Sequence, residues 1–582
     1  MDEGLRLRIR HIEVRNFRGI HSLSWRVKGD FNCLIGSGDS CKTTILTALD
    51  YALSPRTALT FDDADFFNQD VEHPIIIQVT LNDWDEADEG IRKFFQESKF
   101  AQFKCGLSDA GAIAEPPEGG RPAVSISLRV DKSLEPKWTV TRGRDETEDQ
   151  DRKPIYAIDR AVIGLTRIDL HSDAHFTWGR NTVLTRLSAN NDGNLTEVLA
   201  TLSRDMRQAD ISQHQSIVGC QTVADGIKQA AIDNGVQLTD LVPKIDIQRQ
   251  AAGTGAVSLH EGNVPLRNKG SGSKKLIAAA MQMKLHGGKN ISLIDEIEVG
   301  LEPHRIRGFL IRLSKSPQQI FTTTHSAVVL RELDATANEL YVCKRDADGN
   351  VTVTSMATVP DIQANVRSNA EAFLGNRIVA AEGSTEIGCV RAYDEFRLDE
   401  NDPPVWTLGT AYFNCGGASH IKAVCPKLAQ LGYRVATLCD NDAPQHLSDT
   451  DVATLRAGGT HVCWWDNGNS TEKQLFIDMP WEHIPTMLAK ICEHHDTLEL
   501  ATVIDRIQKE PRVAALNLTN DPAQWTDNPL LRQVMGDLAH EGNWIKRVDL
   551  AGKAFRWALP LLPDTTVIKT RLAQLWTWIQ AP

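Results

Sequence analysis

One stretch of this sequence has the residue types and spacing to bind a nucleotide phosphate. Between Cys33 and Thr44 an apolar run is followed by a loop of small residues and then by Lys42 and Thr43, which open a helical pattern. Backbone N–H groups of such a loop point inward at phosphate, the lysine reaches the β- and γ-phosphates, and the threonine hydroxyl ligates Mg²⁺. The residues expected to contact ATP and its Mg²⁺ here are Gly36, Ser37, Gly38, Asp39, Ser40, Cys41, Lys42, Thr43 and Thr44.

Cys41 stands where the phosphate-loop pattern G-x-x-x-x-G-K-[ST] has its second glycine. A side chain at this position lacks the conformational freedom of glycine and crowds the phosphates. We therefore expect weakened nucleotide binding. Because a plain strand-turn-helix also places a Lys-Thr pair after a loop, the nucleotide interpretation depends on later segments.

Two later segments supply further parts of a nucleotide site. Ser271 and Gly272 lie in a Gly/Ser loop that precedes a helical pattern, and a loop of this form would contact the γ-phosphate held by a second copy of the chain. Asp295 and Glu296 end an apolar run. We expect Asp295 to hold Mg²⁺ through water and Glu296 to orient or deprotonate the attacking water.

His325 ends another apolar run and is expected to contact the γ-phosphate. In isolation each motif has an ordinary structural explanation: a Gly/Ser turn, an acidic pair at a strand end, or a hydrogen-bonded histidine. Together they occur in the order of an ATPase whose nucleotide is shared across a dimer. The sequence therefore predicts a dimeric ATPase.

A second group of candidate residues consists of acids in the last third of the chain. Glu382 follows an apolar run, and Glu386 lies one helical turn beyond it, so both carboxylates are expected to face one crevice at the carboxyl end of a strand. Asp440 and Asp442 follow another apolar run, and Glu472 begins a later helical pattern. Such carboxylates suit hard cations such as Mg²⁺ or Mn²⁺, unless these acids are ordinary polar turn residues.

Alternating strand-like and helix-like patterns around these residues are typical of an α/β protein. We expect an ATPase domain at 1–362, a parallel α/β core at 376–480 and a helical C-terminal part at 481–582. Within the first domain, a polar helical pattern at about 188–236 is either packed on its own domain or extended as a dimerisation arm. The chemistry-bearing residues thus fall in two separate regions.

Composition limits the class of protein. The 582 residues are 41% hydrophobic and 24% charged, as in globular proteins of several domains. The 11 cysteines show no paired or metal-like spacing, which favours reduced thiols in a cytoplasmic protein. We expect no membrane association, because no apolar run reaches the length of a membrane span and the first residues lack the apolar core of a secretory signal. With a net charge of −13, DNA contact would need local basic patches or bound metal ions.

Two motifs resemble known families. The succession of a strand, Asn-Phe-Arg-Gly at 16–19, a second strand and the phosphate loop resembles the opening of RecF/SMC-type ABC ATPases, in which an antiparallel lobe covers the nucleotide. Glu382-Gly-x-Thr-Glu386 with Asp440-x-Asp442 resembles the TOPRIM pattern of topoisomerases, primases and certain nucleases. An ABC-type ATPase followed directly by TOPRIM resembles the OLD (overcoming lysogenization defect) nucleases, whose Gabija relatives act in phage defence. This resemblance covers nearly the whole chain.

The resemblance implies a metal-dependent DNA endonuclease, nicking or cutting both strands, that is regulated by an ATP-binding and ATP-hydrolysing domain in antiviral defence. It implies two Mg²⁺ or Mn²⁺ ions at the TOPRIM acids, with Glu472 as the outlying ligand of the second ion, and Mg²⁺ with ATP at the phosphate loop. It implies that Lys546 contacts the scissile phosphate. The alternative interpretation of this residue is an ordinary surface lysine. The implied partners are DNA, further copies of the chain in a homodimer or larger oligomer, and a helicase or retron partner.

Two other functions stay open at this stage. A sensor or scaffold switched by ATP, in a DNA-repair or toxin–antitoxin assembly, would have a degenerate TOPRIM site, but the acids Glu382, Asp440 and Asp442 are all present. Strand transfer of the topoisomerase type needs a nucleophilic tyrosine, and none of the 6 tyrosines lies in a recognisable nicking module. Nuclease is therefore the preferred prediction.

Overall fold

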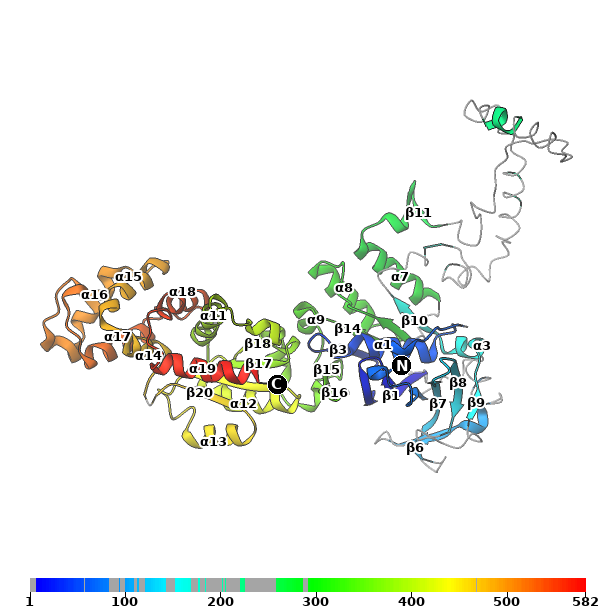
Figure 1. Ribbon diagram of the computed structural model, residues 1–582, viewed down its shortest axis with the longest axis horizontal. Coiled ribbons are helices and arrows are strands. Elements are labelled where there is room, and N and C mark those ends of the chain that lie inside the picture. Colours follow the sequence, from blue (N-terminus) through cyan, green and yellow to red (C-terminus); the bar gives the residue numbers. More distant parts are fainter. Residues whose placement is uncertain are drawn as a thin grey trace.

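The computed structural model describes the two regions that hold the candidate residues (Figure 1). The described residues are 7–56, 58–82, 94, 100–108, 113–114, 121–142, 152–168, 176–177, 184, 201, 205, 220–225, 258–285, 291–466 and 468–581. The predicted helical insertion at 188–236 lies outside them except for Thr201, Asp205 and 220–225, so its role stays a prediction. No helix among the described residues is long and apolar enough to span a membrane.

A mixed sheet forms the first region. Its strands are β1 (Arg8–Phe17), β2 (Ile20–Arg26), β3 (Phe31–Ile35), β4 (Ile75–Asn82), β5 (Cys105–Leu107), β6 (Ile113–Ala114), β7 (Arg121–Val130), β8 (Pro136–Thr141), β9 (Arg152–Pro154), β10 (Leu165–Ile168), β13 (Ile291–Ile294), β14 (Gln319–Thr323), β15 (Leu340–Arg345) and β16 (Asn350–Ser355). The order is β10-β13-β14-β3-β15-β16-β2-β1-β4-β7-β5-β6, and β8 joins β7 to β9.

The parallel half of this sheet positions the nucleotide residues. Strands β10, β13, β14, β3 and β15 pair in parallel, and every residue of β3, β13 and β14 is buried. Continuous apolar strands of this kind are covered on both faces by helices. The carboxyl ends of parallel strands meet at one edge, so the phosphate loop, the acid pair and His325 come together there. The helices are α1 (Lys42–Leu53), α3 (Ala157–Arg160), α7 (Ser271–Leu285), α8 (Pro303–Ser314) and α9 (Ala327–Glu332).

An antiparallel lobe lies beside the parallel half. Strands β1, β2, β4 and β7 pair antiparallel, and β1 turns into β2 at Gly19. A short hairpin, β11 (His260–Glu261) and β12 (Val264–Pro265), precedes α7. The α/β fold with a mixed sheet is thus as the sequence predicts.

The second region is a smaller parallel sheet with helices. Its strands are β17 (Arg377–Ala381), β18 (Thr410–Asn414), β19 (Arg434–Cys439) and β20 (His461–Trp464), in the order β18-β17-β19-β20 with all pairs parallel. The helices are α11 (Ser384–Asp399), α12 (Ala418–Gln430), α13 (Asp449–Ala457), α14 (Thr471–Asp478), α15 (Ile484–His494), α16 (Leu500–Lys509), α17 (Pro529–Glu541), α18 (Val548–Ala558) and α19 (Val567–Gln580). Figure 1 shows α15, α16 and α17 beyond the sheet, at the end of the molecule away from the first region, and α18 beside α11.

One hydrophobic core connects the two regions. Ile320 and Leu340 of the mixed sheet belong to the same buried cluster as Phe373, Phe413 and Leu428. Between the sheets the chain forms α10 (Ile362–Ser368) and a 3₁₀ helix (Ala370–Leu374), both with buried apolar residues. The segment between the predicted ATPase domain and the predicted parallel core therefore packs between the two sheets, and the predicted domain boundaries stay predictions.

Candidate nucleotide and metal sites

The phosphate loop closes around its lysine. Lys42 is only 5% exposed, and its Nζ donates hydrogen bonds to the carbonyl oxygens of Gly36 (3.0 Å) and Ser37 (2.6 Å) and to Oγ of Ser40 (3.0 Å). Burial lowers the pKa of Lys42 from its ordinary value. Gly36 has φ +142°, and a Cβ there would lie 2.5 Å from the carbonyl oxygen of Cys343. The loop thus needs glycine at its first glycine position.

Cys41 adopts the backbone conformation that the phosphate-loop glycine usually supplies. Its φ is 65° and its ψ is 17°, in the left-handed region, where a side chain costs roughly 1–2 kcal/mol. The turn between β1 and β2 makes room for the thiol, because a Cβ on Gly19 would lie 2.9 Å from Sγ of Cys41. The side chain is therefore accommodated at a conformational cost.

The two predicted magnesium-binding residues lie next to each other. Oγ1 of Thr43 donates to Oδ1 of Asp295 at 3.1 Å. Oγ1 of Thr323 also donates to this carboxylate at 2.5 Å, and it accepts from the backbone N–H of Glu296 at 2.8 Å. Thr323, which sequence reasoning did not select, thereby orients both members of the acid pair.

His325 is positioned by an acid that the sequence analysis missed. The Glu298 carboxylate accepts from the hydroxyl of Thr324 at 2.6 Å and from the backbone N–H of His325 at 2.7 Å. Burial and the charge of Lys42 lower the pKa of His325, which favours the neutral form of its ring. A neutral ring can still donate one hydrogen bond to a phosphate oxygen.

The signature-like loop packs against the segment that follows the acid pair. Ser271 begins α7, and a Cβ on Gly272 would lie 2.0 Å from the carbonyl oxygen of Gly300. Glycine is therefore required here for close packing. Contact of Ser271 and Gly272 with a γ-phosphate needs a second copy of the chain and stays a prediction.

Polar contacts tie the phosphate loop to the segment just before β17. Oγ of Ser37 donates to Oδ1 of Asn376 at 2.7 Å. Nζ of Lys344 donates to the carbonyl oxygens of Gly375 (3.2 Å) and Asn376 (3.3 Å) and lies 3.8 Å from the ring centre of Tyr433. Burial and the charge of Lys42 lower the pKa of Lys344 to about 7. A change at the phosphate loop therefore has a direct route to the second region.

The second site is a group of carboxylates at the carboxyl ends of β17 and β19. Glu382 follows β17, Asp440 follows β19, and Glu386 lies in the first turn of α11. The backbone N–H of Asp440 donates to Oε2 of Glu382 at 3.0 Å. Asp440 is 7% exposed and Glu386 is 4% exposed. Three of the predicted acids are thus brought together in a largely buried place.

Thr471 connects two of these carboxylates. Its Oγ1 lies 2.6 Å from Oε1 of Glu386 and 2.8 Å from Oδ1 of Asp440, while it accepts a hydrogen bond from Nε1 of Trp465 at 2.7 Å. A hydroxyl has one proton to donate. The two buried carboxylates therefore share one hydroxyl donor, and each also accepts one backbone N–H, Asp440 from Thr471 and Glu386 from Gly383, both at 2.8 Å. These neutral donors leave the negative charges without full compensation.

Burial and mutual repulsion raise the pKa of these acids. Burial and the charge of Glu472 raise the pKa of Glu386 to about 7. The pKa of Asp440 is raised well above its ordinary value by burial and by the charge of Glu386. Burial also raises the pKa of Glu382. Such a group favours protons or cations.

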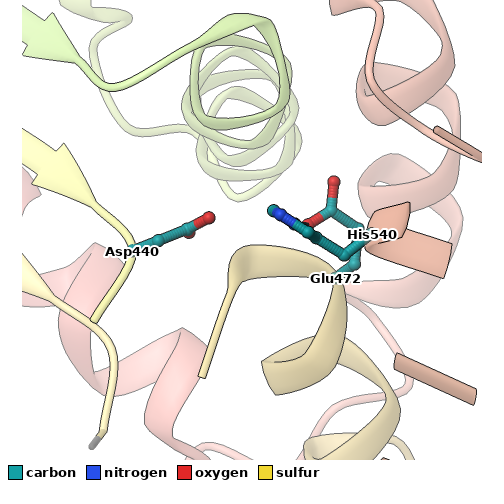
Figure 2. A group of neighbouring side chains, drawn as sticks. All are labelled: Asp440, Glu472 and His540. Atoms are coloured by element: carbon teal, nitrogen blue, oxygen red, sulfur yellow. Dashed lines mark hydrogen bonds and ion pairs between the residues drawn. The ribbon is translucent and has the colours of Figure 1, made fainter. Parts of the chain in front are cut away.

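His540 is brought to the carboxylates by the C-terminal helices (Figure 2). One ligand atom from each of Asp440, Glu472 and His540 lies within 4.8 Å of the others. Nδ1 of His540 is 3.0 Å from Oε2 of Glu472, whose side chain is 1% exposed. Burial would raise the pKa of Glu472, but the hydrogen bond and charge of His540 lower it instead. The same hydrogen bond raises the pKa of His540.

Asp442 and Lys546 complete the surroundings of this group. Nζ of Lys546 lies 3.3 Å from Nε2 of His540, and Oδ2 of Asp442 lies 3.9 Å from the same nitrogen. The buried residues Trp544 and Ile545 anchor the segment that carries Lys546. All the acids and the lysine predicted for this site are therefore near one another, and His540 and Thr471 are additions. His540 and Thr471 do not stand at a characteristic spacing from the acids, so no sequence motif predicted their part in this site.

Comparisons with known proteins address the first region. Residues 31–331 match the family described as "AAA domain, putative AbiEii toxin, Type IV TA system". The chain belongs to this family. Membership confirms the predicted ATPase domain, and Thr43 beside Asp295 fits ATP with Mg²⁺. The carboxylate site of this chain lies beyond the matched residues.

The chain was also compared with solved structures and with curated proteins. The SMC head domain of Pyrococcus furiosus, with an extended coiled coil and bound to the C-terminal domain of ScpA, is 11% identical with a TM-score of 0.31, over 62% of this chain and 100% of that chain. The SMC head domain from Thermotoga maritima is 10% identical with a TM-score of 0.27, over 60% and 98%. The recombination mediator RecF with ATP is 12% identical with a TM-score of 0.30, over 60% and 99%. No curated protein matches the sequence.

Proposed function

We propose that this AAA-family protein is a metal-dependent DNA endonuclease of the TOPRIM type, whose ATPase domain controls cleavage, in antiviral defence. The observation that carries the proposal is the buried group of Glu382, Glu386 and Asp440, whose charges are incompletely compensated. Purely structural acids are usually paired with Arg or Lys, whereas these face one another. Lys546 at the same place supplies the cation that a nuclease needs for a phosphate group.

The donor set fits divalent cations. Glu382, Asp440 and Asp442 would hold one ion, and Glu386 and Glu472 extend the set toward a second. Bound there, divalent cations polarise a phosphodiester and lower the pKa of water to near neutrality. Lys546 would bind a phosphate oxygen, while Thr471 and the backbone N–H of Asp440 hold the carboxylates in position.

Supercoiled and linear DNA cleavage by the purified full chain tests the proposal. Mg²⁺ or Mn²⁺ is supplied, with and without ATP, and wild type is compared with Glu382→Gln. The matched control is Glu395→Gln, which changes an exposed acid on α11. We expect metal-dependent cutting that Glu382→Gln abolishes and Glu395→Gln leaves unchanged.

The rival function predicts the opposite result. If wild type leaves both DNA forms intact with either metal and any nucleotide, while still hydrolysing ATP, the sensor or scaffold function replaces the nuclease. Cutting that survives Glu382→Gln would likewise remove the carboxylate site from the reaction.

A further inference from the structure

The C-terminal helices bring a nitrogen ligand to a site otherwise built from oxygen. His540 lies in the last turn of α17, far in sequence from Asp440 and Glu472, yet its ring faces both carboxylates (Figure 2). The dipole at a helix C-terminus also favours a cation there. This arrangement makes the chemistry of the site different from that of a site of carboxylates alone.

Close packing fixes the position of His540. A Cβ on Gly536, one helical turn before His540, would lie 2.4 Å from Cα of Lys473, the residue after Glu472. Helix α17 can therefore approach α14 this closely only because residue 536 is glycine. The buried Glu472 carboxylate and the His540 ring are thus held together by backbone packing in addition to their hydrogen bond.

The spacing of the donor atoms is that of ligands around one ion. Two ligand atoms at right angles, each about 2.1 Å from an ion, are about 3 Å apart. Nδ1 of His540 and Oε2 of Glu472 are 3.0 Å apart. In the absence of an ion a proton between them makes a hydrogen bond, and metal binding displaces such a proton. The other ring nitrogen, Nε2, lies 3.3 Å from Nζ of Lys546 and 3.9 Å from Oδ2 of Asp442, so these two side chains surround it on the side away from Glu472.

We infer that Asp440, Glu472 and His540 form a mixed nitrogen and oxygen site for a divalent transition-metal ion, with His540 as a direct ligand. Imidazole is a better ligand for Co²⁺ and later first-row ions than for Mg²⁺, which prefers oxygen. The site therefore takes Co²⁺ more tightly than Mg²⁺, and Mn²⁺ to an intermediate degree. The inference names the metal class of the proposed nuclease site, and it rests on the proposed function, which requires a metal ion at these carboxylates.

Direct metal binding to the nucleotide-free full chain tests the inference. Co²⁺ and Mg²⁺ affinities are measured by titration calorimetry for wild type and for His540→Asn. The Asn amide N–H can replace Nδ1–H as a donor to Glu472, so this variant keeps the hydrogen bond and the fold but loses the imidazole ligand. The exposed His446→Ala serves as the control. Thermal unfolding of each protein reports whether the fold is intact.

We expect His540→Asn to weaken Co²⁺ binding about 10- to 100-fold and to change Mg²⁺ binding much less. His446→Ala should bind both ions as wild type does. Unchanged Co²⁺ affinity in a folded His540→Asn protein, or a wild type that binds Co²⁺ no more tightly than Mg²⁺, would overturn the inference.

Failure of the proposed function gives a different pattern. A wild type that binds Co²⁺ through His540 but never cuts DNA would disprove the nuclease while leaving the metal site. A wild type that cuts DNA while His540→Asn binds Co²⁺ normally would disprove the metal role of His540 alone.

Discussion

The two sites of this protein manage charge in opposite ways. At the phosphate loop, the Lys42 ammonium donates hydrogen bonds to backbone carbonyls of its own loop. The Asp295 carboxylate accepts hydrogen bonds from the hydroxyls of Thr43 and Thr323. At the second site, Glu386 and Asp440 share one hydroxyl and repel each other. The first site is locally compensated and can fold without its ligand at little cost. The second is only partly compensated, by His540 beside Glu472, so its stability depends on protons or cations.

The largest expected effects separate the two sites. Asp440→Asn should reduce metal-dependent DNA cleavage on the order of 100-fold or more while leaving ATP hydrolysis intact. Lys42→Ala should abolish ATP hydrolysis while leaving Co²⁺ binding intact, because no residue of the phosphate loop lies in the carboxylate group. Both activities are measured on both variants. Loss of ATP hydrolysis in Asp440→Asn would show that the sites are one cooperative unit.

Because the acids of the second site are only partly compensated, the stability of the metal-free protein should depend on pH. Burial and neighbouring acids raise the pKa of Glu386 from 4.5 to about 7 in the folded chain. The folded state thus keeps a proton that the unfolded state has lost, so stability falls as pH rises from about 4.5 through about 7, by about 3 kcal/mol in total.

Denaturant unfolding between pH 5 and pH 8 measures this loss. Glu386→Gln should make the curve shallower, because glutamine does not titrate while Asp440 and Glu382 still do, and saturating divalent metal should flatten it for wild type. Glu395→Gln is the control on the same helix, where the side chain is exposed. A slope as steep in Glu386→Gln as in wild type would show that Glu386 is not among the titrating groups.

The connection between the sites is open to a direct test. Ser37→Ala or Asn376→Ala removes the hydrogen bond between the phosphate loop and the segment before β17. A typical coupling free energy of about 1–3 kcal/mol would make ATP change the cleavage rate roughly 5- to 150-fold in wild type. In both variants we expect ATP to have little or no effect on the cleavage rate. ATP binding itself should persist in Asn376→Ala, because Asn376 lies outside the phosphate loop. Ser22→Ala, which removes a similar exposed bond to Asn350, should keep the wild-type response to ATP.

Substitution of a tightly packed glycine in the second region, Gly536, can be compared with substitution of an open one in the first, Gly308. Gly536→Ala should move α17 away from α14 and destabilise the fold by about 1–3 kcal/mol, because the new methyl group meets the backbone of Lys473. Co²⁺ affinity should fall with it. Gly308→Ala on α8 in the first region meets open space and should stabilise by up to about 1 kcal/mol. Chemical unfolding of both variants checks the sign, and equal effects would contradict the role given to Gly536.

The smallest effect is expected at Cys41. Cys41→Gly relieves a left-handed conformation at a residue with a side chain and should stabilise the loop by about 1 kcal/mol, with tighter ATP binding. Cys41→Ala keeps the conformational cost while removing the thiol, so it should not reproduce the gain. ATP titration of the three proteins decides between these effects. A gain in both variants would assign the effect to crowding by the thiol.

Sequence reasoning located the ATPase parts well because each is a contiguous strand and loop. The apolar runs before the phosphate loop, before Asp295 and before His325 became β3, β13 and β14, and their parallel pairing places the three loops at one edge. Glu298 was missed because its contact with the His325 backbone arises between two loops. The acids of the second site were selected by the apolar runs that precede Glu382 and Asp440, and only their nuclease roles come from a resemblance, which the comparisons do not test.

The sequence by itself determined the two groups of chemistry-bearing residues, since strand periodicity and loop composition are local properties of the chain. Only the tertiary structure decided that Thr471 lies between two carboxylates, that Ser37 meets Asn376, and that His540 faces Glu472. These contacts join residues up to 339 positions apart. They depend on how helices and sheets pack, as the close approach at Gly536 shows, and no local pattern records that packing.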